Sequence, residues 1–267
     1  MVEPFSVTTA SVAEEIMKVI REAIMSKRLV PGQRYSVEQV ASELNLGVSR
    51  TPVREALVRL ADTGMVRFER NRGVRILQPS VPDMAELYQL RLMVEVPAAY
   101  RAARKADQLL IYKLETTYAG MQKAAEVAET LHRSYKAATD PTLRAELSDQ
   151  LDQVNLDFVN HDILFHELVI GAGGNQRLVA AVRSWRDMAT TMGGWRFAQS
   201  GAALSEHKPI LEALKQADPA AAGRAMRNHL IEAGNLLMTE LRELLPDGGD
   251  FDSSWHEGVA VPDDTTA

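Results

Sequence analysis

The chain has 267 residues, carries a formal net charge of −6 and contains no cysteine. A chain of this length exceeds the usual size of a single hydrophobic core, so we expect two domains, and the lack of cysteine excludes disulfides and thiolate metal sites. No run of 18 apolar residues occurs and the opening MVEPFSVTTA does not resemble a signal peptide, so we expect a soluble cytoplasmic protein that does not bind membranes.

The charge is divided unevenly along the chain. Residues 1–80 contain 12 Lys and Arg against 9 Asp and Glu, a net charge of +3, so the remaining residues carry −9. From Arg50 to Arg75 there are seven arginines and three acids. This pattern disfavours a protein that coats nucleic acid indiscriminately, and it indicates one local segment that is basic enough to hold a polyanion.

The N-terminal part of the chain predicts a loose arm followed by two helices. Residues 1–10 have no helical or strand periodicity, so we expect a flexible arm. Apolar residues recur at helical spacing from Ser11 to Met25. Ser36 followed three residues later by Gln39 is a capping-box pattern, which predicts a short helix at residues 37–44.

A third helix is predicted to begin after Ser49, which is a good N-cap residue, and to stop before Gly64. Its apolar residues form one stripe, while Arg50 and Arg54 lie about 40° apart on another face with Thr51 beside them. Guanidinium groups match phosphates and guanine edges, and a hydroxyl suits either. Taken alone, the same residues fit a solvated helix face equally well.

The segment after this helix predicts a β-hairpin with a basic tip. Residues 65–69 and 74–76 alternate apolar and polar side chains, and the NRG sequence between them is typical of a turn. Two short helices joined by a glycine-containing turn and followed by such a hairpin indicate a winged helix-turn-helix. The tip then lies along the DNA backbone or minor groove, which makes Arg70, Arg72 and Gly73 candidate contacts.

The segment PGQRYSVEQVASELNLGVSRTPVREALVRLADTGMVRFERNRGVRI resembles the DNA-binding domain of the GntR family of bacterial regulators, over about residues 11–77. The SRTPVREAL motif carries most of the resemblance, and NRG in the wing strengthens it. The resemblance implies that the third helix contacts bases and phosphates, that Arg34 and Ser36 approach phosphate, and that the wing enters the minor groove. The full set of expected DNA-contacting residues is Arg34, Ser36, Ser49, Arg50, Thr51, Arg54, Arg70, Arg72 and Gly73.

Nearly all of the remaining chain has helical periodicity. Residues 79–82 are proline-rich and predict a linker. Helices are expected at residues 83–105, 107–139, 142–171, 176–198, 203–216 and 219–245, separated by glycine and Asp-Pro breaks. An antiparallel bundle of six or seven helices follows. Residues 246–267 are acidic and rich in turn formers, which predicts a disordered tail.

Four polar residues fall on the apolar faces of these predicted helices. Asp162 and His166, at positions i and i+4, share a stripe with aromatic and aliphatic residues, and His207 and His229 lie on similar stripes. Each histidine alone would be interpreted as a hydrogen-bonded core residue. Because burying unpaired polar groups is costly, convergence of all four on one cation is favoured. One carboxylate and three imidazoles suit a divalent metal, zinc first and nickel or manganese as alternatives, with coordination positions left open.

Arg91 also lies on an apolar stripe, and Glu95 follows one helical turn later. An inward arginine near a metal with open positions is a suitable receptor for a carboxylate, because the metal binds one oxygen and the guanidinium another. The alternative is an internal Arg91–Glu95 ion pair. The sequence does not separate the two, and both residues are candidates for effector binding.

The segments LYQLRLMVE, DILFHELV, EHKPIL and MRNHLIEA resemble the FCD effector domain of the FadR branch of the same family, over roughly residues 82–245. The resemblance implies a dimer and, as in many FCD members, a metal bound at Asp162, His166, His207 and His229. Such members typically sense small organic acids. We therefore expect a homodimeric repressor that binds a palindromic operator on double-stranded DNA and responds to a small organic acid. The charged stretch at 126–153 is longer than the family's usual second hairpin.

Two other functions are compatible with the polar cluster. A cation with open positions can activate water in a metalloenzyme that acts on a small carboxylate. However, Ile170 stands where a helical zinc-protease motif starting at His166 needs its second histidine, and Glu95 is the one evident inward acid beyond the cluster. The other possibility is a regulator whose metal is purely structural.

Overall fold

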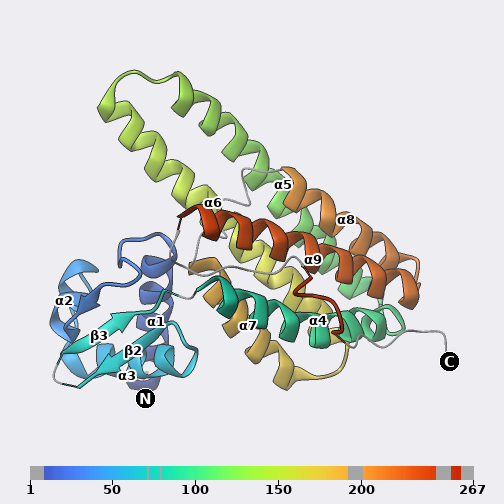
Figure 1. Cartoon of the computed structure of the whole chain (residues 1–267), viewed down its shortest axis with the longest axis horizontal. Helices are drawn as coiled ribbons and strands as arrows, with labels where there is room; N and C mark the ends of the chain where they lie inside the picture. The colour runs from blue at the N-terminus through green and yellow to red at the C-terminus, as the bar shows by residue number, and fades with distance from the viewer. Residues whose placement is uncertain (1–8, 71, 79, 192–200, 245–253, 260–267) are drawn as a thin grey trace, which may run out of the picture. The chain divides into compact units, whose positions relative to one another are not determined.

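The computed structural model describes residues 9–70, 72–78, 80–191, 201–244 and 254–259 (Figure 1). The chain divides into two compact units, Met1–Gln78 and Pro79–Ala267. Among the described residues, the first unit combines helices with a three-stranded antiparallel sheet, and the second unit is helical. The predicted fold class, a winged helix-turn-helix followed by a helical bundle, is confirmed.

The first unit packs three helices and a small sheet around one core. Its elements in chain order are α1 (Thr9–Met25), β1 (Arg34–Tyr35), α2 (Val37–Glu43), α3 (Arg50–Asp62), β2 (Val66–Glu69) and β3 (Gly73–Ile76). Its largest fully buried side chains are Ile20, Ile24, Leu29, Leu57, Leu60, Met65 and Ile76. The apolar stripe of α3 is buried in this core, which leaves the other faces of α3 to solvent.

The sheet contains the predicted hairpin and one strand that the sequence does not predict. Strands β2 and β3 pair antiparallel, with Val66 opposite Ile76. Strand β1 adds to the other edge of β3, where Arg34 lies opposite Arg75, so the order is β1-β3-β2. A strand of two residues is too short to show alternation in the sequence, and its position depends on the edge that β3 offers.

Local side-chain chemistry fixes where helices α2 and α3 begin. The Ser36 hydroxyl accepts from the Gln39 N–H at 3.1 Å and the Gln39 side chain accepts from the Ser36 N–H at 2.7 Å, so the predicted capping box is confirmed. Ser49 is the N-cap of α3 by position, but its side chain makes no capping hydrogen bond. Between the two helices Asn45 and Gly47 both have positive φ, which reverses the chain.

The second unit contains six helices among its described residues. They are α4 (Val81–Ala103), α5 (Gln108–Ala137), α6 (Pro141–Ala172), α7 (Gln176–Thr191), α8 (Gly201–Lys215) and α9 (Pro219–Leu244). Helix α4 begins before the predicted residue because Ser80 and Asp83 form a second capping box, so the last two residues of the expected linker are helical. Residues 192–198 of the helix predicted at 176–198 lie outside the described residues. None of the described helices has the length and apolar composition needed to cross a membrane.

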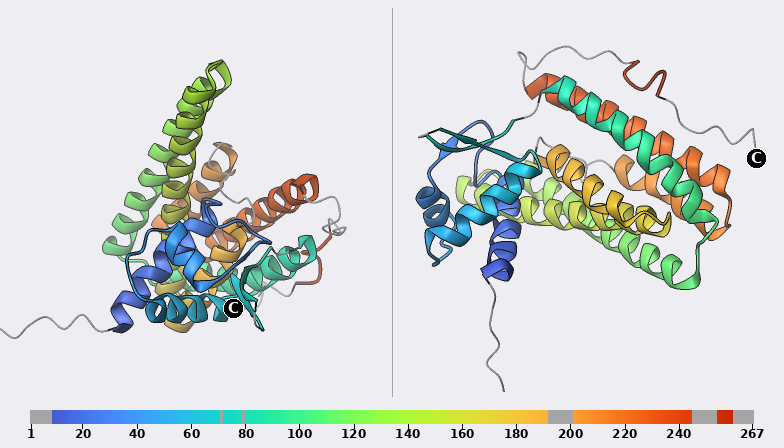
Figure 2. Two further views of the ribbon diagram at one scale, coloured as in Figure 1. Left: turned by 90° about the vertical axis from the view of Figure 1, so that its left-hand side faces the viewer. Right: turned by 90° about the horizontal axis from the view of Figure 1, so that it is seen from below.

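Helices α5 and α6 form a long antiparallel hairpin whose distal end extends beyond the other helices of the unit (Figures 1 and 2). This end corresponds to the charged stretch at residues 126–153. Small or medium apolar side chains are buried between the two helices at this end, including Ala128, Leu147 and Leu151. The opposite end of α6 enters the bundle core, where Phe165 and Val169 are fully buried.

The expectation of a disordered tail at 246–267 does not hold for Ser254–Val259. Trp255 is buried against the core of the helical unit, and its indole N–H donates to the Asn235 side chain of α9 at 2.8 Å. Turn-forming composition predicts a lack of regular structure, but it does not reveal that one aromatic side chain has a packing site. Residues 245–253 and 260–267 lie outside the described residues.

We predict that Gly73→Ala destabilises the winged unit far more than Gly47→Ala. Both glycines have positive φ, at which alanine costs about 1–3 kcal/mol. An added Cβ at Gly47 meets nothing within 4 Å, whereas at Gly73 it would lie 2.3 Å from the backbone oxygen of Tyr35. Hydrogen exchange of the β3 amides in the full chain measures the difference. Equal protection in the two variants would contradict this packing.

Candidate functional site

The exposed side of α3 presents the residues that the sequence predicts to contact DNA. Arg50, Thr51 and Arg54 are exposed, and the buried stripe of α3 lies on the other side of the helix. The Arg50 side chain is 76% exposed, and its Nε pairs with Glu38 Oε1 of α2 at 2.6 Å. The Arg54 guanidinium lies 5.4 Å from the centre of the Phe68 ring of β2. The basic face of α3 is therefore accessible, and neighbouring elements hold its side chains.

Around the wing, Glu69 holds two arginines. Its carboxylate pairs with Arg34 of β1 and with Arg75 of β3, each at 2.6 Å. A hydrogen bond from Arg75, supported by the charge of Arg34, lowers the pKa of Glu69 and keeps it ionised. At the wing tip, Arg70 and Arg72 are exposed. The sequence does not predict that Glu38 and Glu69 pair with the expected contact residues, because these ion pairs join separate elements.

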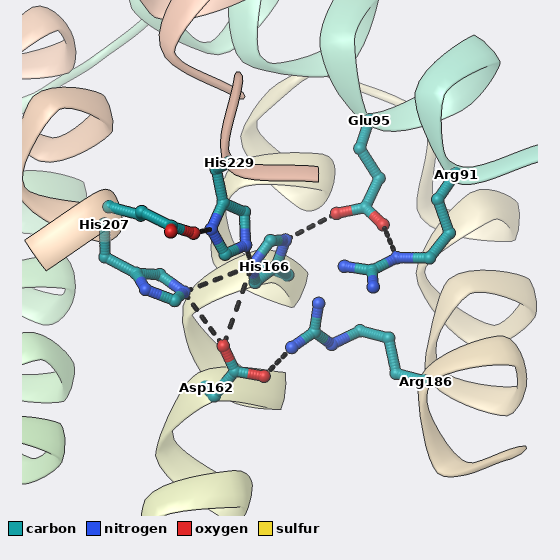
Figure 3. A network of polar contacts seen from close by, with 8 residues as sticks. Arg91, Glu95, Asp162, His166, Arg186, His207 and His229 are labelled. Carbon is teal, nitrogen blue, oxygen red and sulfur yellow. Dashed lines mark hydrogen bonds and ion pairs between the residues drawn. The ribbon is translucent and has the colours of Figure 1, made fainter. Parts of the chain in front are cut away.

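In the helical unit, the structure brings together the four residues of the predicted metal cluster. Asp162 and His166 come from α6, His207 from α8 and His229 from α9, and their ligand atoms all lie within 4.8 Å of one another (Figure 3). The three histidines are at most 5% exposed. Helical spacing of four residues places Asp162 and His166 on the same side of α6, and the apolar stripes of α8 and α9 direct the other two inward.

The Nε2 atoms of the three histidines face one another. His166 Nε2 lies 3.2 Å from His229 Nε2 and 3.3 Å from His207 Nε2. Asp162 Oδ1 lies 2.8 Å from His207 Nε2 and 3.8 Å from His166 Nε2. A tetrahedral zinc ion with bonds of about 2.0–2.1 Å to nitrogen separates neighbouring ligand atoms by roughly 3.3 Å. The spacing of the imidazoles fits a cation of this size.

Two carboxylates outside the cluster determine which ring nitrogen carries the proton. Glu95 Oε2 lies 2.5 Å from His166 Nδ1, and Glu206 Oε2 lies 3.2 Å from His229 Nδ1. Glu95 is ionised and only accepts, so we assign the proton of His166 to Nδ1; above its pKa of about 7, an ionised Glu206 sets the same tautomer in His229. The two Nε2 atoms then meet as lone pairs, 3.2 Å apart. Two lone pairs cannot hydrogen-bond to each other, whereas a cation between them binds both.

Burial keeps two of the clustered imidazoles, those of His166 and His229, neutral. Desolvation lowers the pKa of His166 to about 4, even though Glu95 opposes the shift, and it lowers the pKa of His229 well below its ordinary value. Burial alone would raise the pKa of Glu95, but the charge of Arg91 and the hydrogen bond from His166 outweigh it and hold this pKa well below its usual range. Burial raises the pKa of Glu206 to about 7. Neutral imidazoles with outer carboxylate partners are the protonation state that metal binding requires.

Two buried arginines border the cluster (Figure 3). Arg91 donates from Nε to Glu95 Oε1 at 2.6 Å, which is the internal ion pair that the sequence left as an alternative. Its Nη2 has no hydrogen-bond partner among the described residues. Arg186 of α7 forms an ion pair with Asp162 Oδ2. Arg186 is not among the site residues that the sequence predicts, although it follows the buried Val182 by four residues and so shares its side of the helix.

Glu206 is the other residue of this site that the sequence does not indicate. It directly precedes His207, so it lies about 100° away from the apolar stripe of α8. In the structure its side chain is 25% exposed and contacts His229 of the neighbouring helix. Only the packing of α8 against α9 reveals this contact.

Comparison with known proteins identifies both units. Residues 12–76 match the family model of bacterial regulatory proteins of the gntR family, and residues 86–232 match that of the FCD domain. The transcriptional repressor RspR of Escherichia coli K12 is 27% identical over 227 residues, covering 84% of this chain and 88% of RspR. A probable D-xylose utilization operon repressor of Paenarthrobacter nicotinovorans is also 27% identical, covering 84% of this chain and 87% of that protein.

Solved structures share the fold. Escherichia coli McbR/YncC superposes with a TM-score of 0.67 at 16% identity, covering 86% of this chain and 98% of that one. A GntR regulator from Rhodococcus sp. RHA1 gives a TM-score of 0.59 at 22% identity, covering 85% and 97%. The arginine-bearing helix and wing of the first unit, and the helical second unit, thus agree with the family matches. The chain belongs to the GntR family of bacterial regulatory proteins and is a transcriptional regulator with an FCD domain.

Proposed function

We propose that this protein is a homodimeric cytoplasmic repressor of the FadR branch, and that a small organic acid bound beside a divalent metal changes its affinity for a palindromic operator. The observation that carries the metal and effector part is the set of three buried Nε2 atoms that face one another beside Asp162. Zinc fits one carboxylate and three imidazoles best, and nickel and manganese are the alternatives.

The ion pairs of the first unit support selective DNA binding. Arg50 and Arg34 are already paired with Glu38 and Glu69, so a phosphate or base must replace a carboxylate partner. Breaking these ion pairs costs free energy, and weak, nonspecific contacts with DNA recover little of it. A bidentate contact with a phosphate or base in the correct register recovers this free energy, which favours an operator over random DNA.

The balance of buried charges supports an anionic effector. The positive charges of Arg91 and Arg186 are matched by the negative charges of Glu95 and Asp162. A divalent cation bound by neutral histidines adds two positive charges, and burying uncompensated charge is costly. A carboxylate on the open side of the metal reduces this excess, and a dicarboxylate reduces it further. The Arg91 Nη2 atom, which has no hydrogen-bond partner among the described residues, is a suitable donor to it.

The metalloenzyme alternative gains no specific support from this geometry. A general base must reach the proton that it abstracts. Apart from the proposed ligand Asp162, the carboxylates that contact the imidazoles are those of Glu95 and Glu206 among the described residues, and both contact Nδ1 atoms. They thus serve to orient the metal ligands rather than to activate water.

For DNA binding, we predict that Arg54→Ala weakens operator affinity by about 1–3 kcal/mol, or roughly 5–150-fold, if this residue reads a base. The operator is first selected from random DNA, and fluorescence anisotropy at physiological salt then measures the Kd. Arg224→Ala, which removes an exposed arginine of α9, is the control and should leave affinity unchanged. An Arg54→Ala protein with wild-type affinity would remove Arg54 from the contacts.

For the metal, we predict that His207→Asn lowers zinc affinity by at least about 100-fold, because losing even an outer-sphere partner costs about 10–100-fold. The purified wild-type chain should retain a divalent metal after dialysis, and a chelator should lower its Tm. His132→Asn, which alters a histidine of α5 outside the cluster, is the matched control. The proposal would be contradicted by a wild-type protein that holds no metal and whose Tm is changed neither by zinc nor by the chelator.

A further inference from the structure

The segment Ser254–Val259, which we call the strap, is fixed to two helices of the second unit. Trp255 is only 6% exposed. Its indole N–H donates to Asn235 Oδ1 of α9 at 2.8 Å, and its backbone oxygen accepts from the Gln89 side chain of α4 at 2.6 Å. A buried tryptophan whose N–H is satisfied has one defined position. The strap therefore joins α4 to α9 at that position.

A glycine of α9 makes the space that the indole occupies. A Cβ added to Gly234 would lie 2.8 Å from Trp255 Cζ2 and 2.9 Å from Tyr88 Cδ1. Glycine inside a helix is destabilising relative to alanine, so this position needs a packing reason for its glycine. The reason is the close approach of two aromatic rings. Trp255 and Tyr88 thus share a slot that has no room for a side chain at 234.

Tyr88 connects this slot to the histidine cluster. Its ring meets Trp255 edge to face, with centroids 6.1 Å apart and planes at 83°. The Arg91 guanidinium lies 4.7 Å from the centre of the same Tyr88 ring, on the next turn of α4. Arg91 in turn donates to Glu95, and Glu95 accepts from His166 Nδ1. An unbroken series of contacts therefore joins the strap to one of the proposed metal ligands.

We propose that the strap is a positioning element of the metal site: Trp255 fixes the ring of Tyr88, and this ring holds Arg91 in the orientation that directs Glu95 at His166. The inference rests on the proposed metal function. Glu95 is balanced between two donors, so a displaced guanidinium changes how firmly the carboxylate holds the imidazole. A strap that only covers apolar surface would add stability without affecting the metal.

Two shortened chains test this role. One ends after Ser253 and lacks the strap, and the other ends after Val259 and keeps it. Zinc affinity is measured by competition with a chelating dye. Because the strap acts on His166 through three intermediate side chains, we expect its loss to weaken zinc binding by about 3–10-fold, less than the loss of a direct outer partner. The chain ending after Val259 should match the full chain, and equal affinity in both shortened chains would overturn the inference.

A pair of glycine substitutions tests the same role without shortening the chain, and it decides the question if the chain ending after Ser253 does not fold. Gly234→Ala forces a methyl group into the slot. Gly223→Ala lies on the same helix, where an added Cβ meets atoms no closer than 3.9 Å. Both gain the same helix propensity. We expect weaker zinc binding only for Gly234→Ala, and identical zinc affinities in the two variants would overturn the inference.

A double-mutant cycle separates positioning from general stabilisation. Arg91→Lys keeps the positive charge but removes the planar group that lies over Tyr88. If the strap acts through Arg91, then Gly234→Ala should weaken zinc binding in the wild-type background and have no further effect in the Arg91→Lys background. Additive losses would contradict a route through Arg91. A wild-type chain that does not bind zinc would instead overturn the proposed function itself, and this inference with it.

Discussion

The second unit depends on the meeting of three buried imidazoles and one carboxylate in its interior. Their ligand atoms lie within 4.8 Å of one another, and two of the Nε2 lone pairs face each other at 3.2 Å. Without a cation, this arrangement brings the Nε2 lone pairs of His166 and His229 together in a desolvated core, which is costly. With a cation, these side chains of α6, α8 and α9 bind the same ion and so hold the three helices together. The surrounding carboxylates and arginines then determine the proton positions on the imidazoles and the net charge of the site.

Helix α4 is the element through which this site would act on DNA binding. It carries Arg91 and Glu95, and it begins only five residues after β3 of the winged unit ends. The Ser80 and Asp83 capping box holds its first turn. We infer that an acid bound by Arg91 loosens its ion pair with Glu95 and so changes the contacts of α4, and that the covalent connection passes this change to the winged unit. Such coupling requires that the protein have one conformation with high and one with low operator affinity, and that the acid bind these two conformations with different affinities.

The sequence predicts those features that depend on local chemistry. Capping residues and breaks place most helix ends within a few residues, and helical periodicity directs Asp162, His166, His207 and His229 inward. Features that depend on packing between distant segments are missed. Strand β1 forms by pairing with the edge of β3, and Glu206 joins the site by contacting His229 of α9. The strap packs where Gly234 leaves space for Trp255. The sequence also leaves the role of Arg91 open, because the spacing to Glu95 permits an ion pair without requiring one.

In the proposed function, the binding of metal, acid and operator is coupled. The most direct measurement is the operator Kd of metal-loaded and chelated protein, each with and without a panel of mono-, di- and tricarboxylates. We predict that at least one dicarboxylate or tricarboxylate changes the Kd of the metal-loaded protein, by about 5–150-fold as is typical of allosteric coupling, and leaves the Kd of the chelated protein unchanged. Operator affinity that no acid alters in the metal-loaded protein, or that acids alter equally after chelation, would contradict it.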